Sequence, residues 1–194
     1  MLPIQIRLYR MTDLPGVEAL EARVKPYRPQ DQAAVEAMFE RAKQAERQND
    51  ARWMAPSLHD SPTTPESYSA FWVATQQMTE GANEVIGTVA VLPFRSGVEM
   101  APTHPLAQVW DGRVDVIELR RVRVAAEARG QGIGTQLCQM AIDWGQAQGY
   151  ALMVVNTTTP QTPALRLYQR LGFQAVGISF IGKYELVWQE LKLS

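Results

Sequence analysis

The first residues of the chain alternate between apolar and polar types, as a half-buried strand does. Ile4, Ile6 and Leu8 are separated by polar residues, so this run is predicted to be a strand. Asp13 then precedes an apolar periodic stretch, and Pro15 lies where the first turn of a helix accepts proline. The pattern therefore predicts a strand followed by a helix with Asp13 as its N-cap.

A second helix is predicted from an echo of the first one at an offset of 18 residues. Asp31 takes the place of Asp13, and residues 35–38 repeat the pattern of residues 17–20. Two prolines break the strand pattern before the second copy. Two copies are too few for a solenoid, so the echo indicates similar local chemistry at two helix starts.

The middle of the chain combines a predicted hairpin with two irregular segments. Strand-like runs at residues 71–75 and 85–94 are joined by the polar stretch 76–83, which predicts an antiparallel pair. Residues 49–69 and 95–113 contain prolines and polar residues without periodicity, so both segments are predicted to be loop insertions.

The run at residues 114–124 is strand-like, with a fault in its alternation. Ile117 and Leu119 are apolar in one phase, whereas Val122 and Val124 are apolar in the other. An extra residue near Arg120 and Arg121, a β-bulge, would return the four apolar side chains to one face of the sheet. The alternative is an amphipathic edge strand with an irregular pattern.

The last third of the chain alternates helix and strand patterns. A helix is predicted at residues 135–148, with Leu137, Ala141 and Trp144 on one face and Gly149 after its end. A buried strand, a second helix and a terminal hairpin are predicted at residues 151–155, 163–171, 175–181 and 184–191. Together these patterns predict an α/β fold with a mixed sheet flanked by helices, in a single domain spanning residues 1–194.

The composition restricts the classes of partner. Of the 194 residues 46% are hydrophobic, and the formal net charge is −1, so no global field recruits nucleic acid or an anionic membrane. No apolar run approaches the length of a membrane span, and we expect a soluble, cytoplasmic protein. Cys138 is the single cysteine, and His59 and His104 form no ligand cluster by spacing, so no metal is expected.

A glycine-rich turn at residues 129–134, Arg-Gly-Gln-Gly-Ile-Gly, opens the helix pattern that follows it. Glycine adopts positive φ readily, so closely spaced glycines let successive N–H groups converge, and the helix adds its unpaired N-terminal donors. The turn predicts a phosphate or pyrophosphate site. The alternative is a tight turn that binds nothing. A dinucleotide loop would need G-x-G-x-x-G directly after the strand, and a nucleoside-triphosphate loop would need a lysine before Thr135; both are missing.

The wider run resembles the GNAT superfamily of acetyl-CoA-dependent N-acetyltransferases. The resemblance rests on "ELRRVRVAAEARGQGIGTQL" followed by "PALRLYQRLGF". The acyl-CoA loop of the family, (Arg/Gln)-x-x-Gly-x-(Gly/Ala), is filled here by Arg129, Gly132 and Gly134. The chain departs from the family in having Gln161 where many members have asparagine and Ala126 where a proline is frequent. The fold implied is GNAT-like, with a splayed strand pair at the acyl-CoA site.

The resemblance implies that acetyl-CoA is the cosubstrate, without a metal. It places the backbone of Val122, Arg123 and Val124 along the pantetheine arm, and keeps Gln161 as a cofactor contact. Arg129 would add positive charge, although a solvated arginine is the alternative. The N–H groups implied around the pyrophosphate are those of Gln131, Gly132, Ile133, Gly134 and Thr135. Gly130 is also expected to belong to the cofactor-binding segment.

Two residues are catalytic candidates by the same resemblance. Glu118 lies at the strand position where the family often has its general base, frequently acting through water. Tyr168 lies at the position of the acid that serves the CoA thiolate, and the N–H of Val122 would polarise the thioester carbonyl. The alternatives are an exposed glutamate paired with Arg120 or Arg121, and a tyrosine that only packs between helix and sheet.

These residues predict direct transfer of an acetyl group from acetyl-CoA to a primary amine in a ternary complex. The acceptor is a small-molecule amine, a peptide N-terminus or a lysine, and the two insertions would decide which. One alternative is a non-catalytic acyl-CoA-binding regulatory module, and another is a nucleotide-binding module unrelated to CoA. The apolar terminal hairpin leaves a homodimer open.

The remaining reactive or aromatic residues have simpler structural interpretations. Cys138 is expected to be a core residue rather than a nucleophile. Three tryptophans are expected to anchor the core or the loops, with an acceptor pocket as the alternative: Trp53, Trp72 and Trp110. Three arginines are expected to form a solvated strand face, with recognition of an acidic acceptor as the alternative: Arg120, Arg121 and Arg123.

Overall fold

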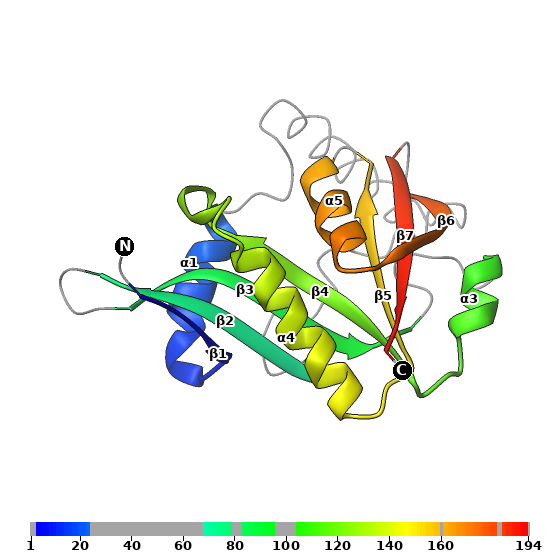
Figure 1. Ribbon diagram of the computed structural model, residues 1–194, viewed down its shortest axis with the longest axis horizontal. Coiled ribbons are helices and arrows are strands. Elements are labelled where there is room, and N and C mark those ends of the chain that lie inside the picture. The colour runs from blue at the N-terminus through cyan, green and yellow to red at the C-terminus, as the bar shows by residue number, and fades with distance from the viewer. Residues whose placement is uncertain are drawn as a thin grey trace, which may run out of the picture.

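The protein is built around a seven-stranded sheet with the strand order β1-β2-β3-β4-β5-β7-β6 (Figure 1). The computed structural model describes residues 3–23, 68–78, 83–95, 104–159, 161–181 and 184–193. The strands are β1 Ile4–Leu8, β2 Ala70–Gln77, β3 Asn83–Pro93, β4 Val116–Val124, β5 Leu152–Thr158, β6 Gln174–Ile181 and β7 Tyr184–Lys192. The helices are α1 Leu14–Arg23, α3 Pro105–Trp110, α4 Ile133–Ala147 and α5 Thr162–Arg170, with short 3-10 turns η1 Met11–Asp13 and η4 Ala126–Ala128.

The sheet is mixed, as predicted. The pair β4·β5 is parallel, and the other five strand pairs are antiparallel. The predicted hairpins are present as β2·β3 and β6·β7. The sequence patterns therefore predicted the α/β class and most of the element order correctly.

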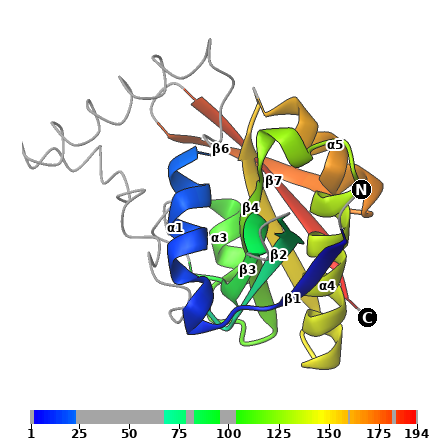
Figure 2. The ribbon, with the colours of Figure 1, turned by 90° about the vertical axis from the view of Figure 1, so that its left-hand side faces the viewer.

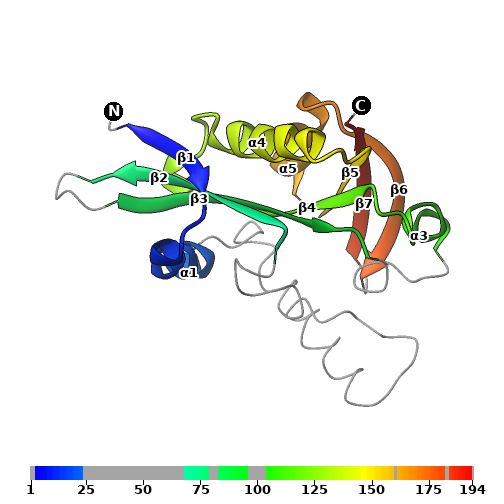
Figure 3. The same cartoon turned by 90° about the horizontal axis from the view of Figure 1, so that it is seen from below.

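Helices cover both faces of the sheet (Figure 3). In that view α4 and α5 lie above the sheet and α1 lies below it. Helix α4 packs closely against the sheet. A Cβ on Gly87 of β3 would lie 2.9 Å from the Leu137 side chain of α4, and a Cβ on Gly145 of α4 would lie 2.9 Å from the Ile117 side chain of β4. The predicted apolar face of α4 is confirmed, with Leu137 and Ala141 fully buried.

The predicted β-bulge lies in β4. The register pairs Ala90 with Arg120 and Thr88 with Arg123, so two residues of β4 face the single residue between Thr88 and Ala90. Arg121 has a φ of 54°, the left-handed conformation that side chains other than glycine rarely adopt. The extra residue accounts for the change of phase read from the sequence.

The strands β4 and β5 pair over a short distance and then part. Their register covers Val116 to Glu118 on β4 and Leu152 to Val154 on β5. The remaining residues of both strands continue past this point without being paired to each other. We call the opening beyond Glu118 and Val154 the splay; one edge of it is formed by the second half of β4.

One of the two predicted insertions contains a helix, which corrects the prediction of a loop at residues 95–113. His104 caps α3: its Nδ1 accepts from the Leu106 N–H at 3.2 Å, and its Nε2 lies 2.8 Å from the carbonyl oxygen of Ile178 on β6. Leu106 packs over Gly177, where a Cβ would stand 2.7 Å away. These contacts fix α3 against β6 at the edge of the sheet.

A cluster of three aromatic rings joins α3 to the sheet. Phe94, Trp110 and Trp188 have ring centroids 5.2 to 6.0 Å apart. Trp72 is also buried, so Trp72 and Trp110 are core anchors as predicted. Trp53, most of the first insertion and the second copy of the N-terminal echo lie outside the described residues.

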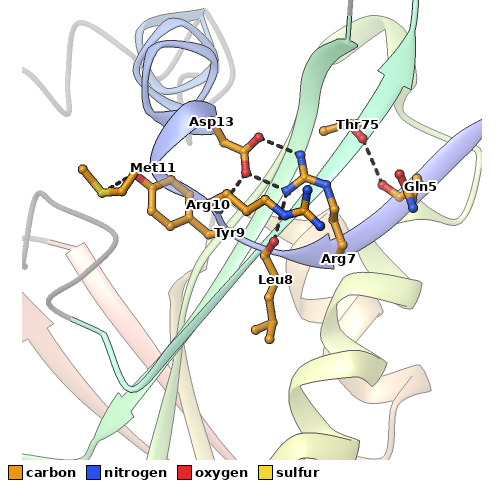
Figure 4. Close-up of polar contacts among 8 residues, drawn as sticks. All are labelled: Gln5, Arg7, Leu8, Tyr9, Arg10, Met11, Asp13 and Thr75. Carbon is orange, nitrogen blue, oxygen red and sulfur yellow. Dashed lines mark hydrogen bonds and ion pairs between the residues drawn. The ribbon is translucent and has the colours of Figure 1, made fainter.

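The N-terminal strand β1 leads into α1 (Figure 2), and an ion pair ties this strand to the turn η1 before the helix (Figure 4). Asp13 directly precedes α1, but its carboxylate turns back toward the strand. It accepts hydrogen bonds from Arg7 at 2.7 Å on each oxygen and from the Arg10 N–H at 2.8 Å. The predicted N-cap role is thereby corrected, because Asp13 stabilises the turn before the helix. The hydrogen bonds from Arg7 hold the pKa of this carboxyl below its ordinary value, even though its burial opposes the shift.

We expect the Asp13→Asn variant to lose about 1–2 kcal/mol of stability at pH 7. Because the pKa of Asp13 is lower in the folded state, its contribution is complete above the unfolded-state pKa and disappears as pH falls through the folded-state pKa. The stabilities of the variant and the wild type, measured by urea unfolding from pH 7 to pH 3, should therefore converge in acid. Asp115→Asn, in an exposed pair with Arg113, is the control and should show a smaller difference. A gap for Asp13→Asn that stays constant with pH would contradict the assignment.

Candidate functional site

The glycine-rich turn follows β4 and the short turn η4 and leads into α4 (Figure 1). Gly130 and Gly132 have φ values of 77° and 78°, and Gly132 is the N-cap of α4, its carbonyl accepting from the Gln136 N–H at 3.0 Å. A Cβ on Gly134 would meet Leu167 at 3.5 Å and Val124 at 3.6 Å, which is ordinary contact. The backbone therefore requires glycine at 132, whereas position 134 accepts alanine.

Three elements meet at this turn. Gly134 lies between Val124 of β4 and Leu167 of α5. Leu167 directly precedes Tyr168 in the chain. Ile133 is buried in the core, so its main chain is the part available to a ligand. Gln131 is exposed, and its side chain donates to the Glu127 carbonyl at 3.4 Å. The structure thus brings the predicted pyrophosphate segment, the end of β4 and α5 together.

The outer edge of β4 presents main-chain groups to the splay. The Ala125 N–H donates to the Ile86 carbonyl at 2.8 Å, so Ala125 faces β3. Peptide groups alternate in direction along a strand, so Arg123 also faces β3 while Val122 and Val124 face the splay. Two arginine side chains donate to these carbonyls: that of Arg123 to the Val122 oxygen at 3.3 Å, and that of Arg129 to the Val124 oxygen at 3.2 Å. The resemblance assigns the charge of Arg129 to the cofactor site, and of Arg123 only the backbone.

Glu118 lies at the point where β4 and β5 part. Its side chain is 2% exposed. Asn156 of β5 donates to Oε1 at 3.2 Å, Arg120 donates to Oε2 at 3.0 Å, and Nε of Arg120 forms an ion-pair contact with Oε1 at 2.9 Å. The exposed-glutamate alternative is therefore wrong about exposure and right about pairing with Arg120. The Asn156 bond spans the two strands just beyond their last backbone pair.

The arginines of β4 do not form the solvated face expected from the sequence. Arg120 pairs with Glu118, and Nε of Arg121 donates to the Tyr68 hydroxyl at 2.8 Å. These side chains, like Arg123, are half-buried. Each of the three guanidinium groups donates to a partner within the protein.

Tyr168 is buried on α5, where its ring packs 5.7 Å from that of Phe173. Burial raises the pKa of Tyr168 above its ordinary value; the neighbouring Cys138 adds to the shift, and the Arg123 guanidinium opposes it. The phenol therefore remains protonated at neutral pH. Packing against the sheet is confirmed for this side chain, and packing is compatible with a role as proton donor.

Glu118 and Tyr168 approach the splay from opposite faces of the sheet. The missing side chain of Gly87 faces α4, so Ala90 and its register partner Arg120 face the other way, as does Glu118 two residues earlier. Tyr168 comes from α5, which lies on the α4 side (Figure 3). The splay is the place where the sheet opens between the two groups.

The remaining candidates have well-defined surroundings. Gln161 precedes α5, and its side-chain amide oxygen Oε1 accepts from the Thr157 hydroxyl at 2.9 Å. Cys138 is fully buried, and burial raises the pKa of its thiol to about 12, so it is not poised as a nucleophile. Within the described residues no group of three or more His, Cys, Asp or Glu side chains could hold a metal ion. None of the helices in those residues has the length and apolar character of a membrane span.

Three residues of the site were missed from the sequence. Asn156 was readable as a polar residue ending a strand, which is a weak signal. Thr88 and Tyr68 carry no local signal, because each reaches Arg121 across the fold from another segment.

Comparison with known proteins agrees with this geometry. The family model for the acetyltransferase (GNAT) family matches residues 32–173. The chain is 34% identical to N-acetyltransferase family 8 member 3 of Rattus norvegicus over 135 residues, 66% of this chain and 51% of that protein. It is 35% identical to human N-acetyltransferase 8B over 126 residues, 65% of this chain and 46% of the relative. The chain thus spans about half the length of the curated relatives it matches.

Solved structures share the fold. An N-acetyltransferase from Staphylococcus aureus Mu50 superposes with a TM-score of 0.58 at 21% identity, covering 99% of both chains. The yncA acetyltransferase of Salmonella typhimurium, solved with its cofactor acetyl-CoA, gives 0.57 at 18% identity over 98% of this chain and 94% of that one. The YhbS protein of Escherichia coli, solved with CoA, gives 0.56 at 21% identity over 100% and 83%. With the splay, the bulge and the glycine turn in place, and with a family match over most of its length, the chain belongs to the GNAT family of acetyltransferases.

Proposed function

We propose that this protein transfers an acetyl group from acetyl-CoA to a primary amine. The observation that carries the proposal is the splay, in which the outward main-chain groups of Val122 and Val124 are followed, after η4, by the glycine turn. A pantetheine arm has amides that can pair with such a strand edge. A pyrophosphate matches the N–H groups of the turn and the N-terminus of α4.

The proposed reaction begins with an amine that must lose its proton. An ammonium with a pKa near 10.4 is neutral in only roughly one molecule in several thousand at pH 7, so a base is needed. Glu118 accepts this proton, directly or through water. The amine nitrogen then bonds to the thioester carbonyl carbon in a ternary complex, and the Val122 N–H stabilises the oxyanion.

Collapse of the tetrahedral intermediate breaks the carbon–sulfur bond. The electron pair leaves with the sulfur of CoA, and Tyr168 donates a hydrogen bond or a proton to it. Its buried, protonated phenol supports this role. The nitrogen, which carries a positive charge after the attack, releases a second proton to solvent, and the Tyr168 phenol regains from solvent any proton that it has given to the sulfur. The products are the acetylated amine and free CoA.

The acceptor is proposed as a chemical class, an amine, in keeping with membership of the family. A neighbour with TM-score 0.59 is the ribosomal-protein-S18-alanine N-acetyltransferase of Escherichia coli, and at 18% identity it supports the fold alone. We therefore propose a small-molecule amine, a peptide N-terminus or a lysine. We place the reaction in the cytoplasm, where a single, unpaired thiol such as that of Cys138 remains reduced.

The glycine-rich turn is tested by calorimetric titration with CoA, using Gly132→Ala and Gly134→Ala as a matched pair. Alanine at 132 must adopt a left-handed backbone, which costs about 1–2 kcal/mol, and the turn will shift its N–H groups to avoid this. We expect CoA affinity to fall about tenfold in Gly132→Ala and to change less than about threefold in Gly134→Ala. Equal losses in both variants would contradict the assignment of the turn.

Turnover is tested by release of free thiol from acetyl-CoA with a panel of primary amines. Release with at least one amine, together with CoA binding, supports the transferase. CoA binding without release for any amine would favour a regulatory module. Binding of ATP or NAD in place of CoA would favour an unrelated nucleotide site and would overturn the proposal.

A further inference from the structure

Thr88 is a buried residue of β3 whose hydroxyl contacts the bulge. Oγ1 donates to the carbonyl oxygen of Arg121 at 2.8 Å, and Thr88 itself is 0% exposed. Arg121 is the residue with positive φ at the bulge. A buried hydroxyl thus binds the carbonyl of the residue that has the left-handed backbone conformation.

The side chain of Arg121 is held as well. Its Nε donates to the hydroxyl of Tyr68 at 2.8 Å, and the Tyr68 ring packs 5.7 Å from that of Phe71 on β2. The left-handed conformation is unfavourable for a residue with a Cβ, so it persists where the surroundings enforce it. Here Thr88 holds the carbonyl and Tyr68 holds the guanidinium.

The carbonyl of Arg121 and the N–H of Val122 belong to one peptide unit. In a trans peptide these two groups point in opposite directions. Thr88 lies on β3, so the Arg121 oxygen points toward β3 and the Val122 N–H points away from it, into the splay. The alternation of peptide groups from Ala125 gives the same direction independently.

We propose that Thr88 is a positioning residue for acetyl transfer: its hydroxyl orients the Arg121–Val122 peptide so that the Val122 N–H meets the thioester carbonyl oxygen. This inference rests on the proposed function. Thr88 itself does not reach the reacting atoms from the far side of the peptide. It acts by keeping the donor aimed where negative charge develops.

The chain offers a matched control in Thr75. Thr75 is also a buried strand threonine, and its hydroxyl donates to the carbonyl of Gln5 at 3.5 Å (Figure 4). This bond joins β2 to the edge strand β1, and β3 separates β2 from β4 and the splay. Valine at either position removes one buried hydroxyl and keeps the branched shape. A general effect of losing such a hydroxyl would appear in both variants.

The experiment compares steady-state kinetics of Thr88→Val, Thr88→Ser and Thr75→Val. We expect kcat to fall about 10- to 100-fold in Thr88→Val, with KM for acetyl-CoA and the Kd for CoA within about threefold of wild type. Thr88→Ser, which keeps the hydroxyl, should recover most of the loss, and Thr75→Val should behave like wild type. If Thr88→Val does not fold, Thr88→Ala makes the same comparison.

An activity-independent measurement uses the backbone amide of Val122. Its nitrogen-15 and proton shifts in the CoA-bound protein should move in Thr88→Val and stay unchanged in Thr75→Val. Unchanged kcat, a loss of CoA affinity in proportion to kcat, or failure of serine to rescue would overturn the inference. If the wild type shows no turnover, the proposed function is overturned instead. The chemical shifts of the Val122 amide then test the role of Thr88 separately. Shifts that stay unchanged in Thr88→Val would exclude a positioning role for Thr88.

Discussion

Replacing Glu118 by glutamine is expected to lower kcat about 100- to 1000-fold, with the Kd for CoA nearly unchanged. Glutamine keeps the length and the hydrogen-bonding oxygen that Asn156 uses, but it cannot take a proton from the amine. Thiol release from acetyl-CoA measures the loss of kcat, and calorimetric titration with CoA measures the Kd.

Arg120→Gln provides the control for the structural role of Glu118. It breaks the same ion pair from the other side and leaves the carboxylate in place. Breaking a buried pair destabilises a protein by about 3–5 kcal/mol, so both variants are assayed well below their unfolding temperatures. If the two variants lose the same fraction of kcat, Glu118 acts through its ion pair with Arg120 and is not the base.

The second large effect is expected at Tyr168. The Tyr168→Phe variant keeps the ring that packs against Phe173 and removes the proton donor, so kcat should fall about 10- to 100-fold while stability and CoA affinity stay close to wild type. Because the pKa of Tyr168 is raised by burial, the phenol is protonated throughout the neutral range. Its contribution should therefore not vary with pH between about 6 and 9.

Tyr150→Phe is the matched control for Tyr168→Phe. Tyr150 is half-buried and stacks on Trp144 at 6.0 Å, at the opposite end of α4 from the glycine turn. Removing its hydroxyl should leave kcat within about twofold of wild type. A kcat for Tyr168→Phe as high as that of this control would assign Tyr168 to packing alone.

Much of the fold could be predicted because its strands and helices have regular apolar patterns. The bulge could be predicted because an extra residue in a strand shifts the alternation of apolar and polar side chains. Ile117 and Val122 are apolar in opposite phases of this alternation, as the bulge between them requires. The helix α3 was missed because six residues are too few to show a helical period. It forms through tertiary contacts, above all those of His104 and Leu106 with β6.

The candidate site was predictable to a smaller extent. The glycine turn and the positions of Glu118 and Tyr168 follow from local motifs, and their roles remain predictions. The burial of Glu118 was not predictable, because an isolated carboxylate favours solvent; here Arg120 and Asn156 compensate for the loss of water. The hydrogen-bond partners in the site are far apart in the sequence: 33 residues separate Thr88 from Arg121, and 38 separate Glu118 from Asn156. A local sequence pattern cannot predict such pairs.

The short register between β4 and β5 also has a consequence for folding cooperativity. The strands β1 to β4 form one ladder and β5, β7 and β6 form another, and three residue pairs join them. Separating the two ladders breaks few backbone hydrogen bonds, so partial opening along this line costs less free energy than opening within either ladder. Each ladder can therefore fluctuate as a unit of its own, and the junction between them is the natural boundary between two foldons.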